Sequence, residues 1–240
     1  MIIKRTSSIK SVAVYCSRSL STAKQLKIQG PAIGAFQLIG DPLLTEHYAK
    51  VRVADNNPGL VQRALDAGAF GIVAPMIINA EDAKLLVINS RYPPMGVRSW
   101  GPSRALANPD TTQANLLVKV FAMIETQEAV DNINEILDVD GLDGVFVGPC
   151  DLSISLGVLP KATPTEPHVV DAIEKVKNGC QSRGKLGLLF CGDQTRAKEA
   201  LREGWSLTFP GADLSWITST LSNITDIKVG GPRPIKSNVG

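Results

Sequence analysis

Lys119-Val120-Phe121-Ala122-Met123-Ile124 runs into Glu125, and Gly144-Val145-Phe146-Val147-Gly148-Pro149-Cys150 runs into Asp151. Each stretch is a short apolar run, as expected of a buried strand. A carboxylate follows directly at the end of each run. Between them, apolar residues recur at helical spacing, at Val130, Ile133, Ile136 and Leu137. The segment therefore predicts a strand, a helix and a second strand, with a right-handed crossover that makes the two strands parallel.

The two carboxylates are expected to face one point. Parallel strands end on the same side of a sheet, and neighbouring strands lie about 4.8 Å apart. Two hard oxygen ligands at such strand ends suit Mg²⁺ or Mn²⁺ better than zinc. The alternative is that Glu125 and Asp151 each cap the helix that follows.

A repeated pattern favours a barrel of βα units. Residues 68–75 and 141–149 both read as helix stop, tight turn, apolar strand and proline, and residues 204–210 form a weaker copy. Strands are predicted at 32–38, 51–53, 71–75, 119–124, 144–147, 186–190 and 207–209. A closed barrel has eight strands. The predicted fold is therefore an α/β chain of the (βα)8 TIM-barrel type that lacks its second βα unit, between residues 49 and 51.

Helices are predicted between most of these strands, at 42–49, from Pro58 to Gly68, after Asn79, through 130–137, from about 168 to 183, at 195–203 and at 213–221. Two long loops are predicted at the upper face of the barrel, at 91–113 and 152–166. In the first loop, Arg98 and Arg104 either bind the distal carboxylate of an acidic substrate or stay solvated. Trp100 is either a packing anchor or a wall of the substrate site.

Composition predicts one soluble globular domain. The chain has 240 residues, of which 44% are hydrophobic and 20% charged, and its net charge is +2. Such a small and mixed charge predicts no nucleic-acid partner, and no apolar run is long enough to predict a membrane span. Residues 1–28 form a basic, Ser-rich and acid-poor leader, which predicts a mitochondrial transit peptide and a matrix location. The alternative is a disordered basic leader on a cytoplasmic protein. Residues 29–225 are assigned to the barrel and 226–240 to a flexible tail.

The four cysteines, Cys16, Cys150, Cys180 and Cys191, form no C-x-x-C pair. Free thiols in a reducing compartment are therefore expected. Cys150 and Cys191 both follow predicted strands and are expected to lie near each other at the barrel mouth.

Several motifs occur together in the order and spacing of a known family: Tyr92-Pro93-Pro94, Gly96-Val97-Arg98-Ser99-Trp100-Gly101-Pro102, Ile124-Glu125-Thr126 and Val147-Gly148-Pro149-Cys150-Asp151-Leu152-Ser153. In these motifs, over roughly residues 31 to 222, the chain resembles the HpcH/HpaI aldolases, which are metal-dependent pyruvate aldolases. The resemblance implies a (βα)8 barrel of the phosphoenolpyruvate/pyruvate superfamily. It also implies a homo-oligomer, a hexamer in which a C-terminal helix is exchanged between subunits.

The resemblance implies roles for particular residues. The metal ligands fall on Glu125 and Asp151, and the bound ion would be Mg²⁺ or Mn²⁺, with Co²⁺ as a further option. The arginine that stabilises the enolate falls on Arg52, whose structural alternative is a salt bridge to a barrel carboxylate. The backbone of Gly148, Pro149, Cys150 and Asp151 would hold the carboxylate of a pyruvate-type 2-oxo acid.

The chain departs from the family pattern in two respects. The family has a strand, a histidine-bearing turn and a helix before the arginine strand, and this stretch is missing, so the catalytic histidine has no counterpart. His47 lies in the first predicted helix and His168 lies at the start of a later one, so neither fits that role. Met123 stands where many members have Gln.

The implied function is carbon–carbon lyase chemistry, in which a 4-hydroxy-2-oxo acid is cleaved to pyruvate and an aldehyde, at a rate reduced by the missing base. The first alternative is an inactive relative or the product of a shortened transcript. The second is a citramalyl- or malyl-CoA lyase, which is disfavoured because the sequence predicts no basic groove for the CoA phosphates.

Overall fold

A single parallel sheet forms the centre of the computed structural model, which describes residues 32–33, 50–66, 69, 71–100, 110–212 and 216–221. The sheet has seven strands in the order β1-β7-β6-β5-β4-β3-β2. These are β1 Ala32–Ile33, β2 Lys50–Arg52, β3 Gly71–Ala74, β4 Lys119–Ile124, β5 Gly144–Val147, β6 Leu186–Phe190 and β7 Leu207–Phe209. Each of the seven predicted strands has a counterpart among them, and residues 34–38 of the first lie outside the described part.

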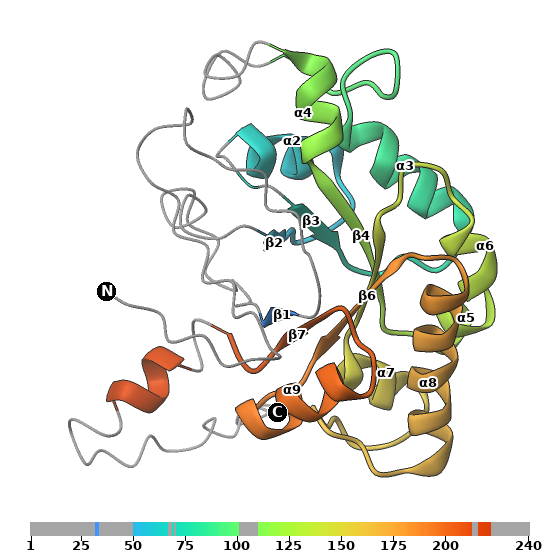
Figure 1. Ribbon diagram of the computed structural model, residues 1–240, viewed down its shortest axis with the longest axis vertical. Helices are drawn as coiled ribbons and strands as arrows, with labels where there is room; N and C mark the ends of the chain where they lie inside the picture. The colour runs from blue at the N-terminus through green and yellow to red at the C-terminus, as the bar shows by residue number, and fades with distance from the viewer. Residues whose placement is uncertain are drawn as a thin grey trace, which may run out of the picture.

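Helices follow the strands and lie along the outer side of the sheet (Figure 1). They are α2 Pro58–Asp66, α3 Ala80–Ser90, α4 Thr111–Leu117, α5 Gln127–Asp131, α6 Ile133–Leu137, α7 Pro149–Ser155, α8 Pro167–Ser182 and α9 Gln194–Arg202. Residues 216–221 are also helical. Asn79 caps α3 as predicted, since its side chain accepts a hydrogen bond from the N–H of Asp82 at 2.9 Å.

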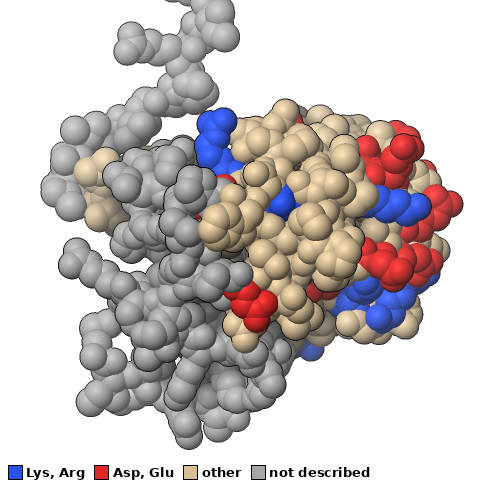
Figure 2. Space-filling model, turned by 90° about the horizontal axis from the view of Figure 1, so that it is seen from above, with Lys and Arg blue, Asp and Glu red and all other residues tan. Residues whose placement is uncertain are grey.

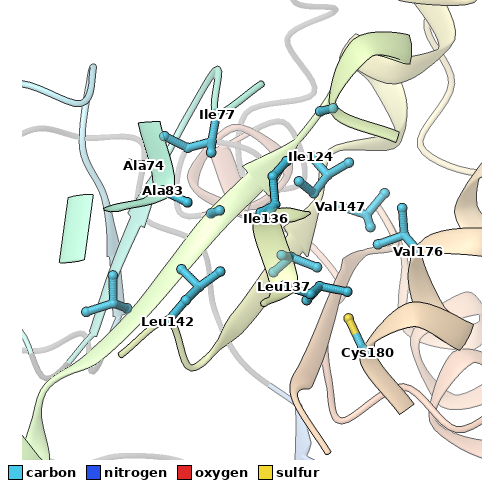
Figure 3. Packing of buried hydrophobic residues seen from close by; sticks show 14 of the residues in the cluster. Ala74, Ile77, Ala83, Ile124, Ile136, Leu137, Leu142, Val147, Val176 and Cys180 are labelled. Carbon is cyan, nitrogen blue, oxygen red and sulfur yellow. The ribbon is translucent and has the colours of Figure 1, made fainter. Parts of the chain in front are cut away.

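The sheet has two apolar faces because alternate residues of a strand point to opposite sides. In β4, Val120, Ala122 and Ile124 join the outer cluster between sheet and helices, part of which Figure 3 shows. Phe121 and Met123 belong to a smaller inner cluster on the concave side. The inner cluster also contains Val73, Phe146, Leu188, Leu207, Phe209 and Ala212. The strands are therefore buried on both faces, as in a barrel wall.

The barrel is open between its first two strands. β1 and β2 are the two ends of the strand order, and no described residue forms a strand between them. This opening lies where the missing βα unit was predicted. Three predicted parts of the chain lie outside the described residues: the basic leader at 1–28, the helix at 42–49 and the tail at 226–240.

Among the described residues, no helix is both long enough and apolar enough to cross a bilayer. Figure 2 shows acidic and basic side chains intermingled on the side where Figure 1 places α5, α6 and α8.

The prediction that the loop at 91–113 lies at the upper face of the barrel is wrong for its described residues 91–100. These residues follow the helix α3, so they lie at the amino ends of the strands, opposite the expected mouth. Arg98 is buried there, donates to Asp66 Oδ1 at 2.7 Å and lies 4.5 Å from the centre of the Tyr92 ring. Its role is therefore structural. Arg104 lies outside the described residues, and Trp100 is half exposed.

Two helices overlap the predicted loops. Asp110 caps α4 by accepting the N–H groups of Thr112 and Gln113 at 3.0 Å. The loop predicted at 152–166 is wrong in its first residues, because α7 runs from Pro149 to Ser155. Proline at the first position of a helix needs no N–H partner, so Pro149 starts the helix rather than only ending the strand.

Arg91 joins the amino ends of β4 and β5. Its Nη1 donates to the carbonyl oxygens of Asn115 at 2.5 Å and Val118 at 2.6 Å. Its Nη2 donates to Gly141 O at 3.2 Å and to Asp143 Oδ2 at 3.1 Å. Burial lowers the pKa of Arg91, and the charge and hydrogen bond of Asp143 oppose that shift. One buried side chain thus satisfies three carbonyl groups, two at the end of α4 and one before β5.

Replacing Arg91 with Met should destabilise the protein by about 3 kcal/mol or more, because Asp143 and several buried carbonyl groups lose their partner. Urea unfolding measures this free energy. Arg183→Met is the matched control, since Arg183 also pairs with an aspartate, Asp138, but on the surface at 2.6 Å. The control should change stability little. Equal effects of the two substitutions would contradict the structural role of Arg91.

Candidate functional site

The register of the parallel strands places Arg52 and Glu125 on the concave face. Arg52 pairs with Val73, and Val73 pairs with Phe121. Paired residues of neighbouring strands point to the same side of a sheet. Val73 and Phe121 belong to the inner cluster, so Arg52 shares their face. Glu125 has the same parity as Phe121 and follows directly after β4.

Glu125 is buried at the carboxyl end of β4 and only 4% exposed. Its Oε1 accepts the backbone N–H of Met76 at 3.2 Å. Its Oε2 is buried and has no hydrogen-bond partner within the described residues. A Cβ atom on Gly148 would lie 3.4 Å from this oxygen and 2.6 Å from Met123 Cε. A side chain at position 148 would therefore collide with Met123, and glycine allows the backbone to pack close to Glu125.

Burial is the main cause of a raised pKa at Glu125, and the nearby charge of Asp151 raises it further. The charge of Arg52 and the hydrogen bond from Met76 act in the opposite direction. Asp151 itself is exposed in the first turn of α7. The charges of Asp151 and Arg52 both shift the pKa of Glu125. The three side chains singled out from the sequence therefore interact electrostatically.

The capping alternative fails for Glu125. The cap of α5 is Thr126, whose Oγ1 accepts the N–H of Ala129 at 3.1 Å. The cap position of α7 is Gly148, which has no side chain to accept a hydrogen bond, so Asp151 is not a cap either. Neither carboxylate is therefore occupied as a helix cap.

The segment from Gly148 to Asp151 offers fewer backbone donors than its length indicates. The N–H of Gly148 donates to Ile124 O at 3.2 Å, and Pro149 has none. Cys150 and Asp151 lie in the first turn of α7, where N–H groups have no acceptor within the helix. These two N–H groups are the ones left to face a ligand.

The cysteines do not meet at the mouth, contrary to the prediction. Cys150 is half-buried in α7, whereas Cys191 is fully buried in the outer cluster and its Sγ lies 3.6 Å from Leu189 O. Cys191 has the parity of Leu189, so it points to the helices. Burial raises the pKa of Cys191 and of Cys180 to about 12. Inert thiols are expected at both positions.

Histidine contributes nothing to the described site. His168 is exposed at the start of α8, and His47 lies outside the described residues. No group of three or more His, Cys, Asp or Glu side chains with metal-binding geometry occurs in the described part of the chain. The two carboxylates at 125 and 151 still fit a hard cation that completes its coordination with water and substrate oxygens, because Oε2 of Glu125 is otherwise left without a partner.

Met76 is a site residue that sequence reasoning missed. It contributes its backbone rather than its side chain, and it has a positive φ of 54°, which is rare for a residue other than glycine. The sequence carries no signal for it beyond Pro75, which marks the end of the strand.

Comparison with known proteins identifies the family to which the chain is similar. The family model of the HpcH/HpaI aldolase/citrate lyases matches residues 37–218. A hydroxypyruvate/pyruvate aldolase of Rhizorhabdus wittichii is 40% identical over 177 residues, which are 72% of this chain and 70% of that protein. A 4-hydroxy-2-oxo-heptane-1,7-dioate aldolase of Klebsiella pneumoniae is 40% identical over 169 residues, and the match spans 68% of this chain but only 63% of that enzyme.

The fold has a close counterpart among solved structures. The crystal structure of an HpcH/HpaI aldolase/citrate lyase family protein from Burkholderia cenocepacia superposes with a TM-score of 0.72 and 27% identity. The superposition covers 82% of this chain and 94% of that protein. The curated relatives are named as aldolases, which are carbon–carbon lyases. On the sequence match and the shared barrel, this chain belongs to the HpcH/HpaI aldolase/citrate lyase family.

Proposed function

We propose that this chain is a divalent-metal-dependent lyase that releases pyruvate from a 4-hydroxy-2-oxo acid. One observation carries the proposal: a buried carboxylate oxygen, Glu125 Oε2, lies at the carboxyl end of β4 and has no hydrogen-bond partner within the described residues. Asp151 and Arg52 act electrostatically on the same carboxylate. An unpartnered buried oxygen in a polar strand-end site is typical of a ligand-binding group.

Glu125 and Asp151 would hold the cation, and Mg²⁺ or Mn²⁺ suits their oxygen atoms. Bound there, the cation would supply Lewis-acid polarisation of the 2-oxo group. Gly148 has no Cβ to collide with Met123 Cε, so its backbone lies close to Glu125, and the apolar inner cluster lies on the same face of the sheet. Low polarity around the site strengthens each charge interaction within it.

The remaining groups would bind and stabilise the substrate. The N–H groups of Cys150 and Asp151 are positioned to receive the pyruvate carboxylate, because both lie in the first turn of α7. Arg52 would stabilise the negative charge that develops on the enolate oxygen. Arg52 lies on β2, and its register with Val73 directs it to the concave face.

A metal-binding relative with little or no turnover is the second candidate. The observation that favours it is the opening between β1 and β2, where the family carries its histidine unit. Mn²⁺-dependent release of pyruvate from 4-hydroxy-2-oxo-heptane-1,7-dioate or oxaloacetate, followed with a coupled dehydrogenase, separates the two. Assembly into a homo-oligomer and a mitochondrial location stay predictions.

Mn²⁺ should bind the purified chain, and Glu125→Gln and Asp151→Asn should each weaken the binding by at least tenfold. Each substitution removes a charged oxygen ligand but keeps the side-chain shape. Electron paramagnetic resonance of free Mn²⁺ gives the dissociation constants. Asp171→Asn removes the same charge from the exposed face of α8 and serves as control. A protein that binds no Mn²⁺, or a control that loses as much affinity, would contradict the proposed site.

The affinity for Mn²⁺ should fall as the pH is lowered through the raised pKa of Glu125, at a higher pH than an ordinary glutamate would show. A proton and the cation compete for the same carboxylate. Arg52→Gln should move this fall to still higher pH, because the Arg52 charge lowers the pKa of Glu125. The measurement is the Mn²⁺ dissociation constant across pH, and a shift to lower pH in the variant would be inconsistent with the proposed geometry.

Arg52→Gln should keep Mn²⁺ binding at neutral pH but reduce turnover by about 10²–10³, since removing one donor from a developing oxyanion has this effect. Arg52→Lys should recover part of the rate, because it keeps the charge but loses the planar fork of donors. Oxaloacetate decarboxylation at saturating Mn²⁺ measures the rate. An unchanged rate in Arg52→Gln would leave Arg52 with a structural role alone.

A further inference from the structure

The backbone turns sharply at Met76, directly after β3 and Pro75. Met76 has a φ of 54°, in the left-handed region, and is the one residue other than glycine with a positive φ in the described chain. Its side chain is 59% exposed, so packing does not explain the conformation. For an L-residue this region is unfavourable because Cβ approaches the backbone carbonyl oxygen. Such strain outside glycine is concentrated at functional sites.

The turn places one backbone donor on one carboxylate oxygen. The N–H of Met76 donates to Glu125 Oε1 at 3.2 Å, across a sequence separation of 49 residues. Among the described residues, Glu125 Oε2 is then the oxygen without a hydrogen-bond partner, and it lies near Gly148. This bond therefore distinguishes the two oxygens of the carboxylate group, because Oε1 is engaged and Oε2 is left for a ligand.

We propose that Met76 is a positioning residue, whose backbone N–H holds the Glu125 carboxylate so that Oε2 is presented to the cation. The inference rests on the proposed metal site. It assigns the function to the backbone of Met76 and none to its side chain. Groups that orient a metal-binding carboxylate matter nearly as much as the ligand, and their loss typically weakens metal binding about 10–100-fold.

An amide-to-ester substitution tests this proposal, because it replaces the N–H by an oxygen atom and keeps the side chain. The α-hydroxy analogue of methionine is introduced at position 76 of the full chain. The matched control is the same change at Ile78, whose N–H also donates to a carboxylate, Asp82 Oδ2, at the same 3.2 Å. Both donor N–H groups lie in the β3–α3 connection, and the control bond involves no residue of the site.

The ester at position 76 should weaken Mn²⁺ binding by at least tenfold, whereas the ester at position 78 should leave it within about twofold. The two proteins should lose similar amounts of thermal stability, since each loses one similar hydrogen bond. Met76→Gly keeps the N–H and suits a positive φ, so it should bind Mn²⁺ within about twofold of the original protein.

Equal Mn²⁺ affinities of the two esters would overturn the positioning role, and so would a large loss of affinity in Met76→Gly, which would implicate the side chain. Both results leave the proposed metal site standing, provided that the unmodified chain binds Mn²⁺. If the unmodified chain binds no Mn²⁺, the proposed function and this inference fall together.

Discussion

The register between parallel strands is the constraint on which this structure depends. Side chains alternate along each strand, so a slip by one residue would exchange the concave and the helix-facing sides. The pairing of Arg52 with Val73, of Val73 with Phe121 and of Met123 with Phe146 puts all of them on the concave side. Glu125 and Gly148 follow two residues beyond the last pair. One register therefore supports the inner apolar cluster and the polar site above it.

Stability and chemistry are separated between the two ends of the sheet. At the amino ends, Arg91 and Arg98 are buried in ion pairs and bind carbonyl groups or an aromatic ring, so their charges are compensated. At the carboxyl ends, Glu125 keeps a buried oxygen without a partner and has a raised pKa. Barrel enzymes share this division, with structural residues at the bottom and reactive groups at the top.

The opening in the barrel affects the site unevenly. β4, which leads to Glu125, is flanked on its side of the sheet by two further strands, and β5, which leads to Asp151, is flanked by three. Arg52 lies on β2, which is itself an end strand. The two carboxylates are thus held by the best-supported part of the sheet, while the arginine is held by the least supported. In the proposed site, cation binding depends on the two carboxylates, whereas turnover also depends on the arginine. The opening in the sheet therefore bears more directly on turnover than on cation binding.

Local patterns determined the strands, most helices and the choice of Glu125, Asp151 and Arg52, because alternation, capping residues and strand-end positions are written in neighbouring residues. The start of α7 and the end of the sheet at which Arg98 lies needed the structure, since Pro149 allows two interpretations and a loop's position depends on the elements around it. Only the tertiary structure decided that Cys191 points away from the mouth and that Thr126, not Glu125, caps α5. It alone revealed the bond from Met76, because a contact between residues far apart in sequence, made through a backbone N–H, leaves no trace in side-chain identity.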